Sequence, residues 1–245
     1  MSQTIRVLPF ASADGATNMS TDEAMLESAV RGVAALRFYT WNEPTLSLGY
    51  FQHVVERQSN ASLARLPWVR RSTGGAAIVH HHELTYALTL PSGKEWVSRE
   101  HWICRAHHVV QRVLAEHGVE SRAVICGEEQ KLGAVVCFLH QTPGDLLISG
   151  SKVAGSAQRK MRGALLQHGS ILLHRSEFAP MFAGICDAPG APEFAPERLA
   201  HVLTKAFAAD TGWELRPGEW TAEELARVPV ISAEKYANRE WNEKR

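Results

Sequence analysis

Cys137 and Lys152 are the two residues of this sequence whose types could together perform a nucleophilic reaction. Cys137 lies in the apolar run 135–138, before the turn-like stretch 141–144. A thiolate is a strong nucleophile, and a nearby cation lowers the pKa of the thiol that forms it. Lys152 could supply that cation, or hold a carbonyl oxygen on which negative charge develops. A cysteine in an apolar strand is also commonly an inert core residue. The spacing permits contact between the two residues without establishing it.

A second candidate feature is the glycine turn in the stretch Arg70-Arg-Ser-Thr-Gly-Gly-Ala-Ala-Ile-Val-His80. Two arginines end a predicted strand, the turn Thr73-Gly-Gly75 follows, and a new apolar strand begins. Glycines let backbone N–H groups approach a ligand closely, and these groups can donate to an oxyanion or a phosphate. The same pattern also fits an ordinary hairpin turn with two surface arginines.

Small residues crowd the predicted strands of a third stretch, Gly150-Ser-Lys-Val-Ala-Gly-Ser-Ala-Gln158, which continues to Leu166-Gln-His-Gly-Ser170. Such residues indicate that another chain or a ligand lies against the strand. Lys152 stands near its start, among small or apolar neighbours. A partly desolvated lysine in this setting could hold a carbonyl oxygen, whereas the ordinary alternative is a surface lysine at a strand end.

Histidines and the remaining cysteines raise the question of a metal site. His80-His-His82 is one cluster, and His101, Cys104, His107 and His108 form another on a predicted helix. The second cluster does not share the apolar stripe of that helix, and there is no paired Cys or H-E-x-x-H motif. We therefore expect no metal. Cys104, Cys126 and Cys186 are expected to be structural.

Composition excludes several classes of partner. The chain has 245 residues, of which 45% are hydrophobic and 21% charged, as in soluble globular proteins. Lys+Arg and Asp+Glu both number 26, so charge gives no reason to expect nucleic acid or an anionic membrane as partner. We read no signal peptide and no membrane-spanning stretch. Four cysteines without a C-x-x-C pair are typical of reduced thiols, so we expect a cytoplasmic protein.

The predicted elements form one α/β (α+β) domain over residues 1–245, without a separate accessory domain. Residues 1–175 alternate strands with helices, and residues 176–245 are mostly helical. A capping box at Ser20-Thr-Asp-Glu23 predicts a following helix. The clearest helix has one apolar stripe and spans Ser98 to about His117. The other predicted elements are strands at Leu36–Thr40, Thr45–Tyr50, Trp68–Ser72, Ala76–His80, Leu84–Leu90, Val119–Ile125, Ala134–Phe138, Asp145–Ser149, Val153–Gln158 and Ala164–Leu173, and helices at Glu197–Ala209, Ala222–Ala226 and Ala233–Lys244.

Taken together and in order, these stretches resemble the biotin/lipoate A/B protein ligase superfamily. Within it, the chain is most similar to the cysteine-dependent octanoyltransferases of lipoate biosynthesis. The block of residues 152–158, continued at 166–170, is the most specific part of the resemblance. The other matching residues are Asn18-Met19, Asp22-Glu23, Arg37-Phe-Tyr39, Trp41-Asn42, Pro44-Thr-Leu-Ser-Leu-Gly-Tyr-Phe-Gln52, Arg70-Arg71, Thr73-Gly-Gly75, His80, Glu83-Leu-Thr-Tyr86, Lys235-Tyr-Ala237, Glu240-Trp-Asn242 and Lys244-Arg245.

The resemblance implies mixed β-sheets flanked by helices, with Cys137 as the acyl-accepting cysteine and Lys152 as the lysine that contacts the acyl carbonyl. Two departures from the family pattern are Ala76-Ala77 after the glycines and His81, where an aspartate is common. They leave the backbone turn intact but put detailed ligand contacts in doubt. The residues expected to bind substrate are Arg71, Thr73, Gly74, Gly75, His80, Gly155, Ser156, Ala157 and His168.

The implied reaction moves an octanoyl group from octanoyl-acyl carrier protein, through a Cys137 thioester, to a lysine of a lipoyl domain. The acceptor would be the glycine-cleavage H protein or a dehydrogenase E2 lipoyl domain. Because the donor thioester is already activated, no cofactor is expected. Three alternatives remain open: an ATP- and Mg-dependent lipoate-protein ligase, an amidotransferase between lipoyl proteins, and a non-catalytic homologue that only binds acyl groups or carriers.

Overall fold

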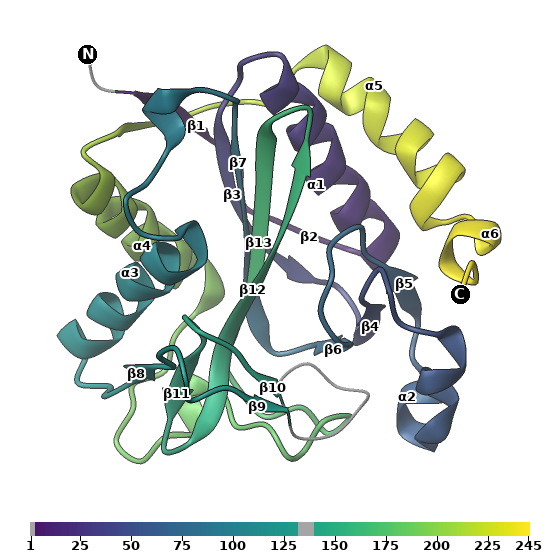
Figure 1. The fold of residues 1–245 in the computed structure, drawn as a ribbon. Helices are drawn as coiled ribbons and strands as arrows, with labels where there is room; N and C mark the ends of the chain where they lie inside the picture. The colour runs from purple at the N-terminus through teal and green to yellow at the C-terminus, as the bar shows by residue number, and fades with distance from the viewer. Residues whose placement is uncertain (1–2, 132–139) are drawn as a thin grey trace.

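The computed structural model describes residues 3–131 and 140–245. The predicted strand Ala134–Phe138, with Cys137, lies outside these residues. The central layer is a mixed sheet in the order β14-β1-β3-β7-β13-β12-β11-β8, with β2 paired to β3 (Figure 1). Neighbours from β3 to β8 are antiparallel, whereas β1 runs parallel to β3 and β14. The strands are β1 (Thr4–Val7), β2 (Ala11–Ala13), β3 (Ala35–Trp41), β7 (Glu83–Leu90), β8 (Arg122–Ala123), β11 (Leu146–Ile148), β12 (Ser151–Met161), β13 (Ala164–Leu172) and β14 (Glu214–Pro217).

Helices cover both faces of this sheet (Figure 1). On one face, α3 (Trp102–Glu116) and α4 (Pro196–Thr211) pack into a large apolar cluster. The predicted stripe of α3 is confirmed, since Ala106, Val109 and Val113 are fully buried in it. The other face is covered by α1 (Gly15–Val30), α5 (Ala222–Ile231), the π-helix η5 (Ser232–Tyr236) and α6 (Arg239–Asn242).

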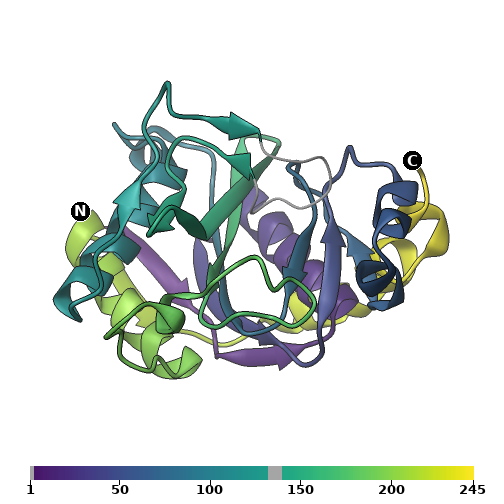
Figure 2. The same cartoon turned by 90° about the horizontal axis from the view of Figure 1, so that it is seen from below.

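A second, three-stranded sheet in the order β5-β4-β6 lies beside the β12–β13 hairpin, on the side of α1 (Figures 1 and 2). The β4 strand runs parallel to β5 and antiparallel to β6. Because β6 leads directly into β7, the small sheet is held at one end of the central sheet. The remaining elements are β4 (Thr45–Leu48), β5 (Trp68–Arg70), β6 (Ile78–His80), α2 (Ala61–Arg65), the paired strands β9 (Gln130–Lys131) and β10 (His140–Gln141), and the 3₁₀ turns η1 (Val54–Ser59), η2 (Lys94–Trp96) and η4 (Ile185–Asp187).

The start of α1 differs from the prediction. The helix begins at Gly15, and Asp14 caps it by accepting from the backbone N–H of Thr17 at 2.9 Å. The predicted capping residue, Ser20, lies inside the helix, where its hydroxyl donates to a carbonyl of the preceding turn. Serine hydroxyls make both kinds of backbone bond, so the residue pattern alone did not separate a cap from an interior position.

The tail is mostly helical, as predicted, but one of its elements was not predicted. It contains β14, which pairs in parallel with β1 at the other end of the chain. Four residues are too few for a readable alternation, and the partner strand is more than 200 residues away. The last predicted helix, Ala233–Lys244, is divided between η5 and α6, because Asn238 leaves helical geometry and caps α6. No helix in residues 3–131 or 140–245 is long and apolar enough to cross a membrane.

Candidate active site

A cavity of about 490 Å³ lies between the small sheet and the β12–β13 hairpin. Its wall is mostly apolar and aromatic. The wall is formed by residues of β3, of the loop after β5, and of the middle of β12 and β13. The strands β12 and β13 supply most of its small side chains. The cavity is large enough for a small acyl group and its activated end. The lining residues are Met19, Tyr39, Trp41, Arg71, Gly74, Gly75, Ala76, Ile78, His80, Thr85, His140, Thr142, Lys152, Gly155, Ser156, Ala157, Gln158, His168, Gly169 and Ser170.

Lys152 is buried in this wall and paired with Asp145. Its ammonium lies 2.7 Å from a carboxylate oxygen of Asp145, and both side chains are about 97% buried. The same carboxylate oxygen accepts from the backbone N–H and hydroxyl of Thr142, at 2.7 and 3.0 Å. Lys152 also donates to the carbonyl of His140 at 3.1 Å. A buried ion pair with this many hydrogen bonds holds the ammonium in one orientation.

The absence of a side chain at Gly155 makes room for this ion pair. A Cβ atom there would lie 2.5 Å from Cε and 2.9 Å from Nζ of Lys152, and 3.3 Å from Asp145. This close approach explains the small residue that the sequence places three positions after the lysine on β12. Gly155 therefore positions Lys152.

The glycine loop is clamped by Arg71. Its guanidinium donates to the carbonyls of Ser47, Gly74 and Ala76, at 3.1, 2.8 and 2.8 Å. The loop also touches Gly49 so closely that a Cβ atom there would lie 1.7 Å from the carbonyl oxygen of Gly75. Within the described ranges, the N–H groups of Gly74 and Gly75 donate to no other backbone group. An oxygen of a ligand could accept from them.

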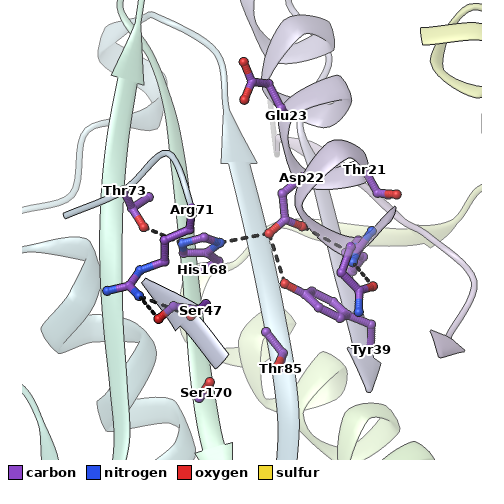
Figure 3. Close-up of polar contacts among 12 residues, drawn as sticks. Thr21, Asp22, Glu23, Tyr39, Ser47, Arg71, Thr73, Thr85, His168 and Ser170 are labelled. Atoms are coloured by element: carbon purple, nitrogen blue, oxygen red, sulfur yellow. Dashed lines mark hydrogen bonds and ion pairs between the residues drawn. The ribbon is translucent and has the colours of Figure 1, made fainter. Parts of the chain in front are cut away.

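A chain of buried polar groups holds the start of the same loop (Figure 3). The carboxylate of Asp22, on α1, lies 2.9 Å from Nδ1 of His168, on β13. Nε2 of His168 lies 2.7 Å from the hydroxyl of Thr73. Because a carboxylate only accepts, Nδ1 donates to Asp22, and Nε2 is left to hydrogen-bond the hydroxyl of Thr73. Tyr39 also donates to Asp22 at 3.0 Å, and burial raises the pKa of its phenol well above the usual value.

A second chain of the same kind supports Arg71. Glu83 lies 2.7 Å from Nδ1 of His80, and Nε2 of His80 lies 2.7 Å from the hydroxyl of Ser47. Ser47 accepts in turn from Arg71 at 3.2 Å. The ring of Trp41 stacks on His80 with centroids 3.8 Å apart. His80 therefore lines the cavity as part of a fixed aromatic stack.

His107, on α3, buttresses the far side of β12. Its Nδ1 lies 2.6 Å from the carbonyl of Gly144 and its Nε2 lies 2.7 Å from the hydroxyl of Ser156, which also bonds the phenol of Tyr86 at 2.7 Å. Burial lowers the pKa of His107 to about 4, and it raises the pKa of Tyr86 to about 12. The network is therefore neutral at physiological pH. It joins Gly144, next to Asp145, to the cavity wall at Ser156.

The structure brings most of the predicted site residues together around this cavity. Lys152 and eight predicted binding residues line it: Arg71, Gly74, Gly75, His80, Gly155, Ser156, Ala157 and His168. Thr73 is 99% buried and lies behind the wall, against His168. Cys137 lies outside the described residues. Sequence reasoning missed Asp145, Asp22, Glu83 and His107 as members of the site.

Comparison with known proteins gives a consistent family. The model of the lipoyl protein ligase A/B catalytic domain matches residues 14–187. Relatives named octanoyltransferase LipM include that of Kyrpidia tusciae, 33% identical over 98% of both chains. That of Staphylococcus aureus is 31% identical over 98% of this chain and 99% of its own.

Solved structures agree with this match at the level of the fold. A putative lipoate protein ligase of Thermoplasma acidophilum, Ta0514, with bound lipoic acid, superposes with a TM-score of 0.79 at 20% identity over 100% of both chains. A lipoate-protein ligase A bound with ATP superposes with a TM-score of 0.77 at 20% identity over 99% of both chains. The predicted mixed sheets flanked by helices are thus confirmed. This chain belongs to the lipoyl protein ligase A/B catalytic-domain family.

Proposed function

We propose that this protein is an octanoyltransferase of protein lipoylation, which moves an octanoyl group from a thioester donor to a lysine of a lipoyl domain. The observation that carries the proposal is the Lys152–Asp145 pair, buried in the wall of an apolar cavity of about 490 Å³. An acyl chain fits the apolar part of such a cavity, and a fixed ammonium fits the carbonyl at its reacting end. The relatives that match nearly the whole chain are named octanoyltransferase LipM, which agrees with this activity.

We assign the nucleophile to Cys137. Lys152 donates to the carbonyl of His140, where the described chain resumes at the cavity wall. Three peptide units separate Cys137 from His140, a span of at most about 11 Å for any chain. A cation close to the thiol would favour a thiolate over a thiol.

The reaction then has two halves. The Cys137 thiol gives up its proton and its thiolate attacks the donor thioester; a new C–S bond forms, the donor C–S bond breaks, and the proton goes to the donor thiolate that leaves. An acceptor lysine, as its free amine, attacks the enzyme thioester, the C–N bond forms, and the proton it loses returns to the Cys137 thiolate that leaves. In both halves the carbonyl oxygen becomes an oxyanion, which the Lys152 ammonium and the N–H groups of Gly74 and Gly75 would stabilise.

The donor in this proposal is octanoyl-acyl carrier protein. The acceptor is a lipoyl domain of the glycine-cleavage H protein or of a dehydrogenase E2 subunit. The reaction needs neither nucleotide nor metal, because the thioester supplies the driving force for both halves. We place it in the cytoplasm, in keeping with the unpaired cysteine pattern of the sequence.

The test is a transfer assay with a purified lipoyl domain, read by mass spectrometry of the acceptor. One arm supplies octanoyl-acyl carrier protein without ATP, and the other supplies lipoic acid with ATP and Mg²⁺. We expect octanoylation in the first arm only. Modification in the second arm alone would identify a lipoate-protein ligase instead, and binding of the donor without modification in either arm would identify a non-catalytic homologue.

A further inference from the structure

Three side chains of types that can bind a metal lie outside the cavity, in the segment that joins β13 to α4. His174, Cys186 and Glu193 each present one ligand atom, and these three atoms lie within 4.8 Å of one another. Nε2 of His174 and a carboxylate oxygen of Glu193 are 2.7 Å apart. None of the three residues lines the cavity. A nitrogen, a sulfur and an oxygen ligand in one place form a donor set that Zn²⁺ accepts.

The backbone itself holds Cys186 close to His174. The N–H of Cys186 donates to the carbonyl of Leu173 at 2.9 Å, next to His174. Gly184 makes this approach possible, because a Cβ atom there would lie 2.2 Å from the backbone of Leu173. The proximity of Cys186 to His174 is therefore fixed by tight backbone packing and does not depend on side-chain rotation.

Groups around the three side chains are arranged as the outer shell of a metal site would be. The N–H of Phe194 donates to the sulfur of Cys186. A carboxylate oxygen of Asp187 lies 3.6 Å from Nδ1 of His174, on the side away from Glu193. Asp187 is held there by the backbone N–H groups of Arg175 and Gly184, both at 2.8 Å. A carboxylate behind a metal-binding histidine sets its tautomer so that the other ring nitrogen faces the ion.

Two further histidines, His81 and His82, lie near His174. They line, together with His174, a void of about 10 Å³ whose other residues are Val79, Leu172, Ser176, Ala179 and Phe182. The rings of His82 and His174 have centroids 6.4 Å apart. A bound cation would stabilise this group of a thiol, two carboxylates and several imidazoles, because it offsets the negative charge of the carboxylates and the thiolate.

We infer that His174, Cys186 and Glu193 form a Zn²⁺ site, in which Nε2 of His174, the Cys186 thiolate and a Glu193 carboxylate oxygen bind the ion. The Cys186 thiol loses its proton to solvent on binding. The site ties the segment after β13 to the segment before α4. It lies outside the cavity and takes no part in acyl transfer. It is independent of the proposed function, and it replaces our expectation that Cys186 is merely structural.

The test is binding of Co²⁺ and Zn²⁺ to the full chain after treatment with a chelator. Co²⁺ reports a thiolate ligand by its sulfur-to-metal charge-transfer band, and Zn²⁺ affinity is obtained by competition with a chromophoric chelator. We expect one equivalent and the band in the wild type. Cys186→Ser should lose the band and weaken Zn²⁺ binding by at least tenfold, and Asp187→Asn should weaken it by about 10- to 100-fold.

The matched control is Cys126→Ser, which removes an exposed thiol elsewhere on the chain. It should bind both ions as the wild type does. A wild-type protein with no charge-transfer band would overturn the proposal. So would equal Zn²⁺ binding by the Cys186→Ser and Cys126→Ser variants, because the metal would then be held elsewhere. Circular dichroism of each variant shows whether a lost site reflects a lost fold.

Discussion

The ammonium of Lys152 lies 2.7 Å from the carboxylate of Asp145, with both groups almost completely buried beside the cavity. The two residues come from neighbouring strands of one hairpin, since Asp145 precedes β11 and Lys152 lies on β12. Burying an ammonium is costly unless it is paired and hydrogen-bonded. Asp145 therefore offsets the cost of placing the ammonium of Lys152 in the cavity wall, where the proposed chemistry uses it.

Replacing that carboxylate should lower activity more than it disturbs the fold. Asp145→Asn keeps the bonds to Thr142 in part but removes the negative charge beside Lys152. We expect kcat for octanoyl transfer to fall by about 100-fold, the range seen when one electrostatic element of an active site is removed. Asp210→Asn is the control, because Asp210 pairs with Arg105 and Arg112 and none of the three lines the cavity. Equal activities of the two variants would show that Asp145 has no part in the reaction.

A single methyl group should be enough to displace Lys152. In Gly155→Ala the new Cβ would lie 2.5 Å from Cε of Lys152, so the lysine must leave its present position. We expect at least a tenfold loss of kcat, with secondary structure unchanged by circular dichroism. A variant as active as the wild type would mean that the ammonium acts from more than one position.

The hydroxyl of Thr73 should matter, although it lies behind the cavity wall. Thr73→Val keeps the shape but cannot donate to His168, whereas Thr73→Ser keeps the hydroxyl. Because the bond anchors the loop that carries Gly74 and Gly75, we expect Thr73→Val to lower kcat about tenfold with little change in KM. Thr73→Ser should restore most of the loss. Failure of serine to restore it would indicate that the methyl group, and not the hydrogen bond, is required.

His107 should make stability depend on pH. Burial lowers the pKa of its imidazole from 6.5 to about 4, so the folded protein leaves the ring neutral while the unfolded chain protonates it. The free energy of unfolding should therefore fall by about 3 kcal/mol from this residue as the pH drops from 6.5 to 4. Urea unfolding over this pH range, compared with His107→Gln, measures the contribution. Identical pH dependence of the two proteins would contradict it.

Some parts of the cavity wall could be predicted from local patterns in the sequence. The small residues of β12 and β13 and the Gly-Gly turn were recognisable from residue types alone, and they do line one cavity. Lys152 was singled out by its small neighbours, and the structure places it in the cavity wall, while its role stays a prediction. The apolar stripe of α3 likewise follows from spacing.

The residues that orient these groups were missed because their contacts are non-local. Asp22 meets His168 across 146 positions, and no periodicity connects them. Asp145 could have been found, since the β11–β12 hairpin pairs Leu146 with Ala154 and so brings the residue before Leu146 close to Gly155 and Lys152. His107 was grouped with the more exposed histidines of its helix, although it is fully buried against Gly144 and Ser156.

The most direct test of the account is intact-protein mass spectrometry after mixing the protein with octanoyl-acyl carrier protein, without ATP and without an acceptor. We predict one octanoyl adduct on the wild type that is removed by hydroxylamine, none on Cys137→Ala, and a strongly slowed adduct on Lys152→Met. An adduct that survives in Cys137→Ala would contradict the assignment of the nucleophile. The absence of any adduct from the wild type, despite normal transfer once a lipoyl domain is added, would contradict the acyl-enzyme itself.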